Sequence, residues 1–284
     1  MENTEIKAAR TTYVAKDNEL IQTASYKLTA EEQKLVCYVI SKIKPSDRPF
    51  QKYTISALDF AEVCGIDKRN VYRDFKAIID SLQEKSRWVR IGDDVTLFSV
   101  FNEPTYNEKQ GSISLYLNTR LHKYLLNLVE KGGNYTQYEL WNVLSLKSKY
   151  SIRLYELFRS YSYQNKKEFE LDRLRGLLCV ENYARYPEFK RWVLDKAIAE
   201  INQYTDLKVS FKPVKTGRAH KITSVIFYIT RKEPNEKISA YWKTVNRINT
   251  KNKQIKGQMS MFDLDIENEI KHTDQLISIT GATQ

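Results

Sequence analysis

The chain has 284 residues and carries 46 Lys and Arg against 35 Asp and Glu, a formal net charge of +11. Its length suits two domains of roughly 100 to 130 residues, and 42% of its residues are hydrophobic, which is enough for packed cores and excludes a globally disordered chain. The basic surplus is typical of proteins with a polyanionic partner, most often nucleic acid, although charge alone also fits a basic protein without one.

The sequence predicts no membrane segment. The longest apolar run near the start, Leu35–Ile40, is far shorter than the roughly 20 residues of a membrane-spanning helix, and Met1–Arg10 lacks a signal-peptide core. We therefore expect a cytoplasmic protein with no membrane contact. The three cysteines are far apart and lie in apolar patterns, which predicts reduced, buried thiols at Cys37, Cys64 and Cys179.

The motifs of common enzymes are absent from the sequence. No Gly is followed by Lys, so there is no phosphate loop, and there is no G-x-S-x-G nucleophile elbow. The three histidines, His122, His220 and His272, are too far apart in sequence to form a metal-binding pair. A tyrosine without a metal or base beside it is a poor nucleophile. The sequence therefore predicts a binding protein without catalysis, cofactor or metal.

In the first half, Thr29 and Glu32 form a capping-box pattern before apolar residues spaced along one helix face. Ser56 is the expected N-cap of a second helix, which Gly65 ends. Two alternating strands around Gly92 predict a β-hairpin, which we interpret as a wing after a helix-turn-helix. The predicted elements are a helix from residue 30 that ends before residue 45, a strand at 51–55, a helix at 57–64, a polar turn at 66–70, a helix at 71–84, strands at 88–91 and 95–101, and a strand at 113–117.

The second half predicts the same order of elements. Asp172 is the expected N-cap of its second helix, as Ser56 is in the first half. Pairing Ser56 with Asp172, Ile55 with Leu171 and Leu58 with Leu174 gives one offset of 116 residues, which indicates an internal duplication. The predicted elements are a helix at 151–163, a strand at 167–171, a helix at 173–179, a turn at 181–187, a helix at 189–204, and wing strands at 207–211 and 222–230.

Helix, strand, helix, turn, helix and two strands is the order of a winged helix, in which the second helix of a helix-turn-helix enters the DNA major groove. We therefore predict an α+β fold of two tandem winged-helix domains with a flexible C-terminal tail. Gly132 and Gly133 are the expected hinge. The predicted boundaries are an N-terminal arm at 1–14, domain 1 at 15–131, domain 2 at 132–232 and the tail at 233–284.

The second half also resembles a known family, the Rep_3 type of plasmid replication initiators that bind iterons. The first half matches more loosely, through Asn18–Ile21 and Leu28-Thr29, so the resemblance covers residues 15 to 232. The matching stretches in the second half are Ser151–Leu157, Phe169–Asp172, Leu174-Arg175, Tyr186–Arg191, Val193-Leu194, Ala197-Ile198, Glu200–Asn202, Thr205–Leu207 and Lys215–Arg218.

The resemblance implies a function and partners. Such proteins bind direct repeats, the iterons, in double-stranded plasmid origin DNA as monomers, with both domains on the DNA. Their dimers often repress their own gene. They open neighbouring AT-rich DNA and recruit host replication proteins such as the replicative helicase and the host initiator. They have no nucleotide site of their own, in agreement with the missing phosphate loop.

Candidate DNA-binding residues gather at the third helix and wing of each domain, where Arg and Asn reach base edges and Lys binds phosphate. In domain 2 they are Arg185, Lys190 and Arg191 by the helix and Lys212, Lys215, Arg218 and Lys221 at the wing. In domain 1 they are Lys68, Arg69, Asn70, Arg73 and Lys76. The alternatives are a solvated helix face with Arg191 near Asp195 or Asp206, and a domain 1 that serves dimerisation.

The tail contains a short segment that resembles the peptide by which replication proteins dock on the bacterial sliding clamp. After Pro234 the apolar pattern loosens, with one short helix expected near Tyr241 and Trp242. The segment is Gln258, Met259, Ser260, Met261 and Phe262. Met261 and Phe262 suit an apolar pocket, and Gln258 suits hydrogen bonds that fix the register. The alternative is that the segment packs on the protein's own surface.

Two other functions fit parts of the sequence. A transcription repressor with two winged helices and no replication role would carry the same fold, because fold alone does not define function. An enzyme that nicks DNA through a tyrosine would need metal ligands that the sequence lacks.

Overall fold

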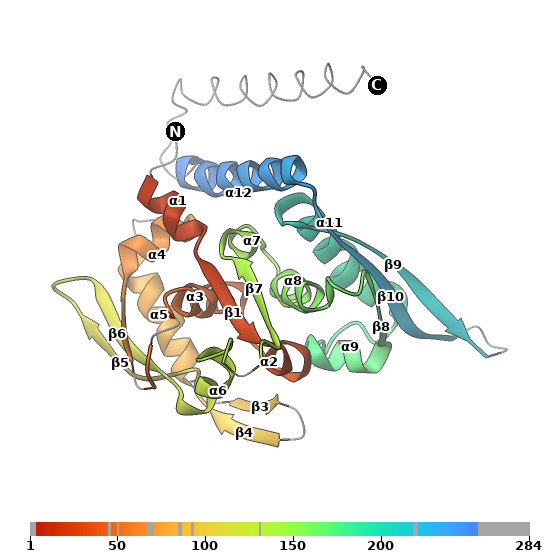
Figure 1. The fold of residues 1–284 in the computed structure, drawn as a ribbon, viewed down its shortest axis with the longest axis horizontal. Coiled ribbons are helices and arrows are strands. Elements are labelled where there is room, and N and C mark those ends of the chain that lie inside the picture. The colour runs from red at the N-terminus through yellow and green to blue at the C-terminus, as the bar shows by residue number, and fades with distance from the viewer. Residues whose placement is uncertain are drawn as a thin grey trace, which may run out of the picture.

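A computed structural model describes residues 4–44, 47–49, 51–66, 71–84, 87–91, 94–130, 132–217 and 221–254. Two winged-helix units lie beside each other, and their wings extend from opposite ends of the molecule (Figure 1). Within the part of the chain that the structure describes, no helix is long and apolar enough to cross a membrane.

Local signals place the first helix-turn-helix where the sequence predicts it. Thr29 and Glu32 form the reciprocal capping box of α3 (Ala30–Ile40), and the Ser56 hydroxyl accepts a bond from the Asp59 amide at the start of α4 (Ala57–Cys64). Gly65 ends α4 in the left-handed region, with φ 68°. The second helix of the motif, α5, spans Val71–Glu84 as predicted, and it buries Phe75, Ile79 and Leu82.

The wing of the first unit differs from the prediction. The hairpin predicted as the wing, strands β3 (Arg87–Ile91) and β4 (Asp94–Phe98), pairs only with itself among the described strands. Strand β2 (Lys52–Ser56) pairs instead with β6 (Ser112–Leu117), which pairs with β5 (Phe101–Asn107). The wing is therefore the β5–β6 hairpin, and the predicted wing is an additional hairpin inserted between α5 and β5.

The second unit repeats the architecture. Helix α8 (Lys149–Tyr161) precedes strand β8 (Lys166–Glu170) and helix α9 (Leu171–Leu177). The next helix starts as α10 (Tyr186–Phe189), passes through a π-helical turn at Lys190–Leu194 and continues as α11 (Asp195–Tyr204). Strands β9 (Leu207–Thr216) and β10 (Lys221–Arg231) form the wing, in a sheet of order β8-β10-β9.

Two predictions in this unit are wrong. Asp172 does not cap α9, because the helix begins at Leu171 and Glu170 is the N-cap, without a side-chain bond. The third helix begins at Tyr186 rather than Phe189, because Pro187 fits the first turn of a helix, where no amide donor is needed.

The internal duplication is present at a different offset. Strands β2 and β8, helices α4 and α9 and the residues after them correspond at 114 residues, not 116. At this offset Phe60 matches Leu174 and Phe75 matches Phe189, and all four side chains are buried. Gly65 then matches Cys179, and both have positive φ, 68° and 49°. One backbone path is thus used twice, from the sheet through the turn into the second helix.

A shared core joins the two units. Strand β1 (Tyr13–Asp17) pairs with β7 (Tyr135–Glu139), and α8 is buried on nearly every side beneath them. In this core the Lys16 ammonium lies 2.5 Å from the Glu156 carboxylate, which also accepts a bond from the Tyr138 hydroxyl. Short helices complete the junction: α1 (Thr4–Arg10), α2 (Asn18–Thr23), α6 (His122–Leu125) and α7 (Trp141–Leu144).

The predicted N-terminal arm is anchored to domain 1, since the buried Arg10 donates bonds to the carbonyls of Glu62 and Val63 in α4. The predicted hinge, Gly132-Gly133, leads directly into β7, so the chain on both sides of it contributes to one core. The domain boundary at residue 131 or 132 stays a prediction. Cys37 and Cys64 are buried as expected, Cys179 is half-buried, and all three are free thiols.

The segment after Pro234 is not loosely organised where the structure describes it. Residues Pro234–Gln254 form helix α12, which crosses the top of the molecule from α1 to α11 (Figure 1). Tyr241 packs edge-to-face on Trp141, with ring centroids 5.5 Å apart. Ile248 lies against Gly65 at the end of α4, and Arg247 pairs with Glu200 of α11 at 3.2 Å. This corrects the expectation of a tail from residue 233.

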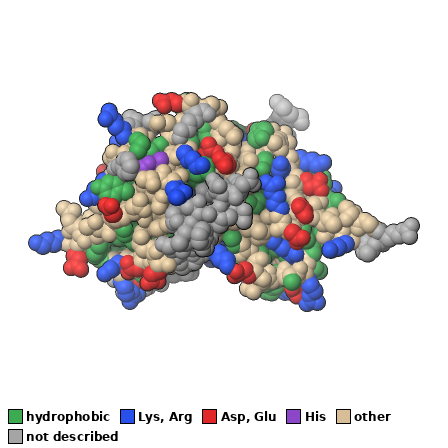
Figure 2. Space-filling view, turned by 90° about the horizontal axis from the view of Figure 1, so that it is seen from below, with side chains coloured by type: hydrophobic (Ala, Val, Ile, Leu, Met, Phe, Trp, Pro, Cys, Tyr) green, Lys and Arg blue, Asp and Glu red, His purple; other side chains and the backbone are tan. Residues whose placement is uncertain are grey.

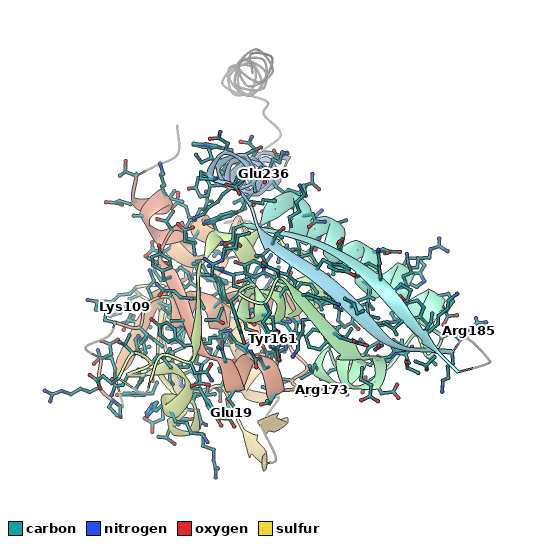
Figure 3. All side chains as sticks on the ribbon, turned by 45° about the vertical axis from the view of Figure 1, so that its right-hand side comes forward. Glu19, Lys109, Tyr161, Arg173, Arg185 and Glu236 are labelled. Atoms are coloured by element: carbon teal, nitrogen blue, oxygen red, sulfur yellow. The ribbon has the colours of Figure 1, made fainter. Side chains whose placement is uncertain are left out.

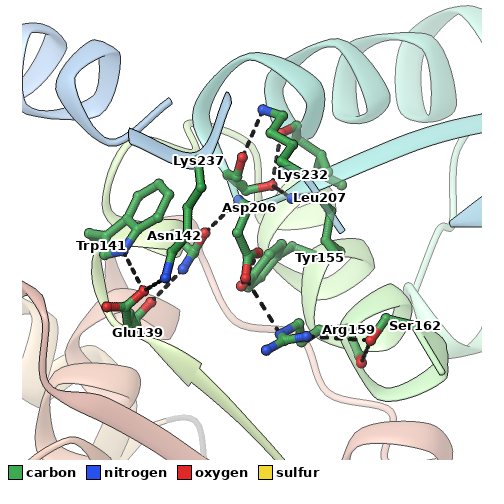
Figure 4. A network of polar contacts seen from close by, with 12 residues as sticks. Glu139, Trp141, Asn142, Tyr155, Arg159, Ser162, Asp206, Leu207, Lys232 and Lys237 are labelled. Carbon is green, nitrogen blue, oxygen red and sulfur yellow. Dashed lines mark hydrogen bonds and ion pairs between the residues drawn. The ribbon is translucent and has the colours of Figure 1, made fainter. Parts of the chain in front are cut away.

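A polar network lies beneath the start of α12 (Figure 4). The Tyr155 hydroxyl donates to Asp206 at 2.9 Å, and the Asp206 amide donates to the Asn142 side chain at 2.8 Å. Lys237 of α12 reaches Glu139 of β7 at 2.5 Å. The network joins α8, the loop before β9 and the β7–α7 corner, and so fixes the base of the second wing.

Candidate nucleic-acid interface

The helix-turn-helix of the second unit is held by its own side chains. Arg175 of α9 donates to the carbonyls of Tyr183 and Ala184 in the turn, at 3.2 and 2.7 Å, and its guanidinium lies over the Phe189 ring. Arg175 therefore has a positioning role that the sequence did not indicate. Tyr186, at the start of α10, is half-buried.

In the second unit, the helix that runs from α10 through the π-helical turn into α11 is the second helix of the helix-turn-helix. Its exposed side carries the predicted cations, which differ in their contacts. The Lys190 ammonium is paired with Asp195 at 2.8 Å, and Arg185 binds Glu188 at 2.6 Å. Arg191 pairs with neither Asp195 nor Asp206; its guanidinium lies 4.9 Å from the centroid of the Trp192 ring. Arg191 is thus the predicted base-reading cation of this helix that carries no ion pair in the described structure.

Among the described residues of the second wing and its base, some basic side chains are exposed and others are engaged by protein groups. Lys212, Lys215 and Lys221 are exposed on β9 and β10, whereas Arg218 lies outside the described residues. Lys208 approaches Glu236 at 3.8 Å. Lys232 donates to the carbonyls of Asn202 and Thr205 at the end of α11, where burial lowers its pKa to about 8. Lys232 therefore caps a helix and does not belong to the exposed basic surface.

In the first unit, the structure describes two of the five candidate residues. Arg73 and Lys76 are exposed on α5, and Arg73 pairs with Asp74 at 3.1 Å. Lys68, Arg69 and Asn70 lie outside the described residues. At the offset of 114, Lys76 matches Lys190 but Ala77 stands where the second unit has Arg191. The second helix of each helix-turn-helix thus carries a lysine at one matching position, but the arginine at 191 has no counterpart in α5.

Basic groups are present at both ends of the molecule as well as between them. Lys109 at the tip of β5–β6 and Arg185 beside the second wing occupy opposite edges, while Glu236 on α12 lies at the top, away from both (Figure 3). Seen from below, Lys and Arg side chains occur across the face, toward both ends and in the middle, mixed with Asp and Glu (Figure 2). This distribution suits an elongated polyanion that contacts two separate modules.

Two exposed residues of the second helix were missed from the sequence. Trp192 is 40% exposed, and the Lys196 ammonium lies 4.1 Å from the centroid of its ring. The helical spacing of 192 and 196, away from the apolar face of Phe189, Val193 and Ala197, was the signal that could have identified them. The segment Gln258–Phe262 lies outside the described residues.

The fold and its exposed helices define the class: a tandem winged-helix DNA-binding protein. Residues 13–159, more than half of the chain, match the family model described as initiator replication protein, WH1, and residues 170–229 match initiator Rep protein, WH2. The chain therefore belongs to the Rep_3 family of plasmid replication initiators, which bind DNA sequence-specifically. The first match extends past the predicted boundary at residue 131.

Relatives of known role agree with this assignment. The chain is 28% identical over 229 residues to a replication initiation protein of Escherichia coli, across 76% of this chain and 69% of that protein. It is 28% identical over 230 residues to the PI protein of Escherichia coli, across 68% and 75% respectively. The crystal structure of Pi initiator protein in complex with iteron DNA superposes with a TM-score of 0.64 at 25% identity, covering 79% of this chain and 99% of that one.

Proposed function

We propose that the chain initiates plasmid replication by binding direct repeats, iterons, in double-stranded origin DNA with both winged-helix units. The observation that carries this proposal is the duplicated helix-turn-helix at a constant offset of 114 residues, with exposed cations on each second helix. The similar Pi initiator protein was solved with iteron DNA, which is the partner proposed for this chain. The protein acts through binding and carries out no catalysis.

The two kinds of basic group have different roles in this proposal. Arg191 on the second helix reads a base edge, since Arg binds guanine through two hydrogen bonds in the major groove. Lys212, Lys215, Arg218 and Lys221 of the wing bind phosphate, which contributes affinity without sequence discrimination. Arg73, Lys76 and the segment Lys68–Asn70 give domain 1 a second, weaker contact, and Lys190 and Arg185 contribute after exchanging their carboxylate partners for DNA.

Protein partners complete the proposed role. Monomers bind the repeats, dimers repress the chain's own gene, and the DNA-bound protein recruits the replicative helicase and the host initiator. The segment Gln258–Phe262 docks on the sliding clamp. A peptide of this segment should bind purified clamp, and the same peptide with Met261 and Phe262 replaced by Ala should not.

The reading role of Arg191 is tested by fluorescence anisotropy on repeat-bearing origin DNA and on scrambled DNA of equal composition. Arg191→Ala should reduce the difference in binding free energy between the two DNAs by about 1–3 kcal/mol. Lys190→Ala should have a smaller effect, because Asp195 already pairs with that ammonium. Lys243→Ala on α12 removes the same charge from an exposed site and serves as the control. An unchanged ratio for Arg191→Ala would remove this helix from the reading role.

The alternative, a repressor without a replication role, receives no support from the family or its relatives. It would be favoured by protection of a single inverted repeat over a promoter, with no protection of direct repeats.

A further inference from the structure

The indole of Trp192 is placed on the outside of the helix that the proposed function assigns to DNA. Its 40% exposure contrasts with Phe189, Val193 and Ala197 of the same helix, which are all buried. Two cations approach the ring, the Arg191 guanidinium at 4.9 Å and the Lys196 ammonium at 4.1 Å from the centroid. An apolar surface is thus presented between positive charges, at the part of the helix proposed to enter the major groove.

Comparison of the two units shows how this exposure arises. At the offset of 114, Trp192 matches Ile78 of α5, which is partly buried and packs against the core. Helix α5 is α-helical throughout Val71–Glu84, whereas the second unit has a π-helical turn at Lys190–Leu194. A π turn holds one residue more than an α turn, so it rotates the residues within it around the helix axis. The same position therefore faces the core in one unit and solvent in the other.

Single π turns within α-helices occur often at functional sites. In the second unit, Phe189 before the turn and Val193 within it both stay in the core, whereas Trp192 within the turn is exposed. Leaving an indole in water forgoes the stabilisation of about 25 cal/mol for each Å² of apolar surface that burial would give. Direct contact with an apolar group of DNA would recover it.

We propose that Trp192 reads a thymine in the target DNA through apolar contact with its C5-methyl group, while Arg191 and Lys196 bind the neighbouring polar and phosphate groups. In the major groove, thymine alone presents a methyl group, and apolar side chains distinguish it by contact. This inference rests on the proposed function, because it requires the second helix to enter the major groove.

The experiment replaces the thymines of the protected site one at a time by deoxyuridine, which removes only the methyl group and keeps the base pair. Binding is measured by anisotropy for the wild type, Trp192→Ala and Trp192→Phe. Loss of one methyl contact, about 0.8 kcal/mol, corresponds to about a fourfold weaker binding. The wild type should show this loss at one position or more, Trp192→Ala should show none there, and Trp192→Phe should retain part of it.

A matched control is available on α12, where Trp242 is 39% exposed. Trp242→Ala should keep the wild-type dependence on the thymine methyl, and both alanine variants should unfold at similar urea concentrations. If Trp192→Ala loses affinity for thymine and uracil sites by equal factors with the dependence intact, or if the wild type shows no dependence, the inference is overturned and the proposed function stands. If the wild type does not distinguish the repeats from scrambled DNA, the proposed function fails as well.

Discussion

The ion pair between Lys16 and Glu156 allows a quantitative test of the junction between the two units. The side chains are 6% and 1% exposed, and they join β1 to the central helix α8. Lys16→Met keeps most of the length of the side chain and leaves the carboxylate buried without its ammonium partner. Breaking a buried pair from one side costs about 3–5 kcal/mol. Because the Tyr138 hydroxyl still donates to Glu156, we expect a loss near the lower limit, about 3 kcal/mol.

The assay is urea unfolding at pH 7 of the wild type, Lys16→Met and the double variant Lys16→Met/Glu156→Gln. The neutral amide introduced by Glu156→Gln should restore most of the loss, since it removes the charge of the buried carboxylate that Lys16 had paired. Lys190→Met provides the control, because its pair with Asp195 is 45% and 43% exposed and exposed pairs contribute about 0–1 kcal/mol. A loss below about 1 kcal/mol for Lys16→Met, or no recovery in the double variant, would refute the reasoning.

The same pair predicts a pH dependence. Burial raises the pKa of Glu156, but the charges of Lys16 and Arg153 lower it by more than burial raises it. The pKa of Glu156 therefore lies below the ordinary carboxyl value. A carboxyl with a lowered pKa stabilises the fold above its unfolded pKa and loses that contribution as the pH falls through its folded pKa. The difference in stability between wild type and Lys16→Met should therefore be largest at neutral pH and should shrink in acid.

Three further predictions concern α12, the end of α11 and the wing. Gly65→Ala should cost at least about 1–2 kcal/mol from the left-handed backbone, plus a collision of the new methyl group with Ile248; equal unfolding midpoints would contradict the packing of α12 on α4. Burial lowers the pKa of Lys232 to about 8, so above that pH the unfolded chain binds more protons than the folded one. The stability of the wild type relative to Lys232→Met should therefore rise between about pH 8 and 10. Parallel pH profiles of the two proteins would argue against a lowered pKa. Replacing Lys212 and Lys215 together by Ala should weaken binding to specific and scrambled DNA alike and lower the slope of log K against log salt by about 2, and an unaltered slope would exclude phosphate contacts from both.

Helix limits set by local chemistry could be predicted from the sequence. The capping box of Thr29 and Glu32, the Ser56 N-cap and the left-handed Gly65 each depend on a few neighbouring residues, and each is present. The third helix, Val71–Glu84, was also predicted to the residue, because its apolar spacing is regular. The tandem winged-helix fold followed from the order of these elements.

Features that depend on distant contacts could not be predicted. The sequence predicted the hairpin β3–β4 and the strand β6 but not β5, and only the pairing of β6 with β2 and β5 identifies the wing. Asp172 has the residue type of an N-cap, but β8 already ends at Glu170 and α9 begins at Leu171. Asp172 therefore lies inside the helix. Helix α12 carries few apolar residues, so its packing on Trp141 and Gly65 was not indicated by its own sequence.

For the candidate site, the sequence indicated which cations lie on the outer side of the helix but not which of them form ion pairs. Charge and helical spacing identified Lys190 and Arg191, but the sequence did not reveal that Asp195 pairs with Lys190 rather than Arg191. The exposure of Trp192 was not predicted, although its helical position away from the buried Phe189, Val193 and Ala197 was a signal for it.

The central claim, recognition of direct repeats, is tested most directly by a nuclease footprint on the DNA that flanks the gene of this chain, with scrambled DNA of equal composition as competitor. We predict protection of several direct repeats at regular, helical-turn spacing that survives the competitor. Equal binding to flanking and scrambled DNA, with no protected repeats, would contradict the claim.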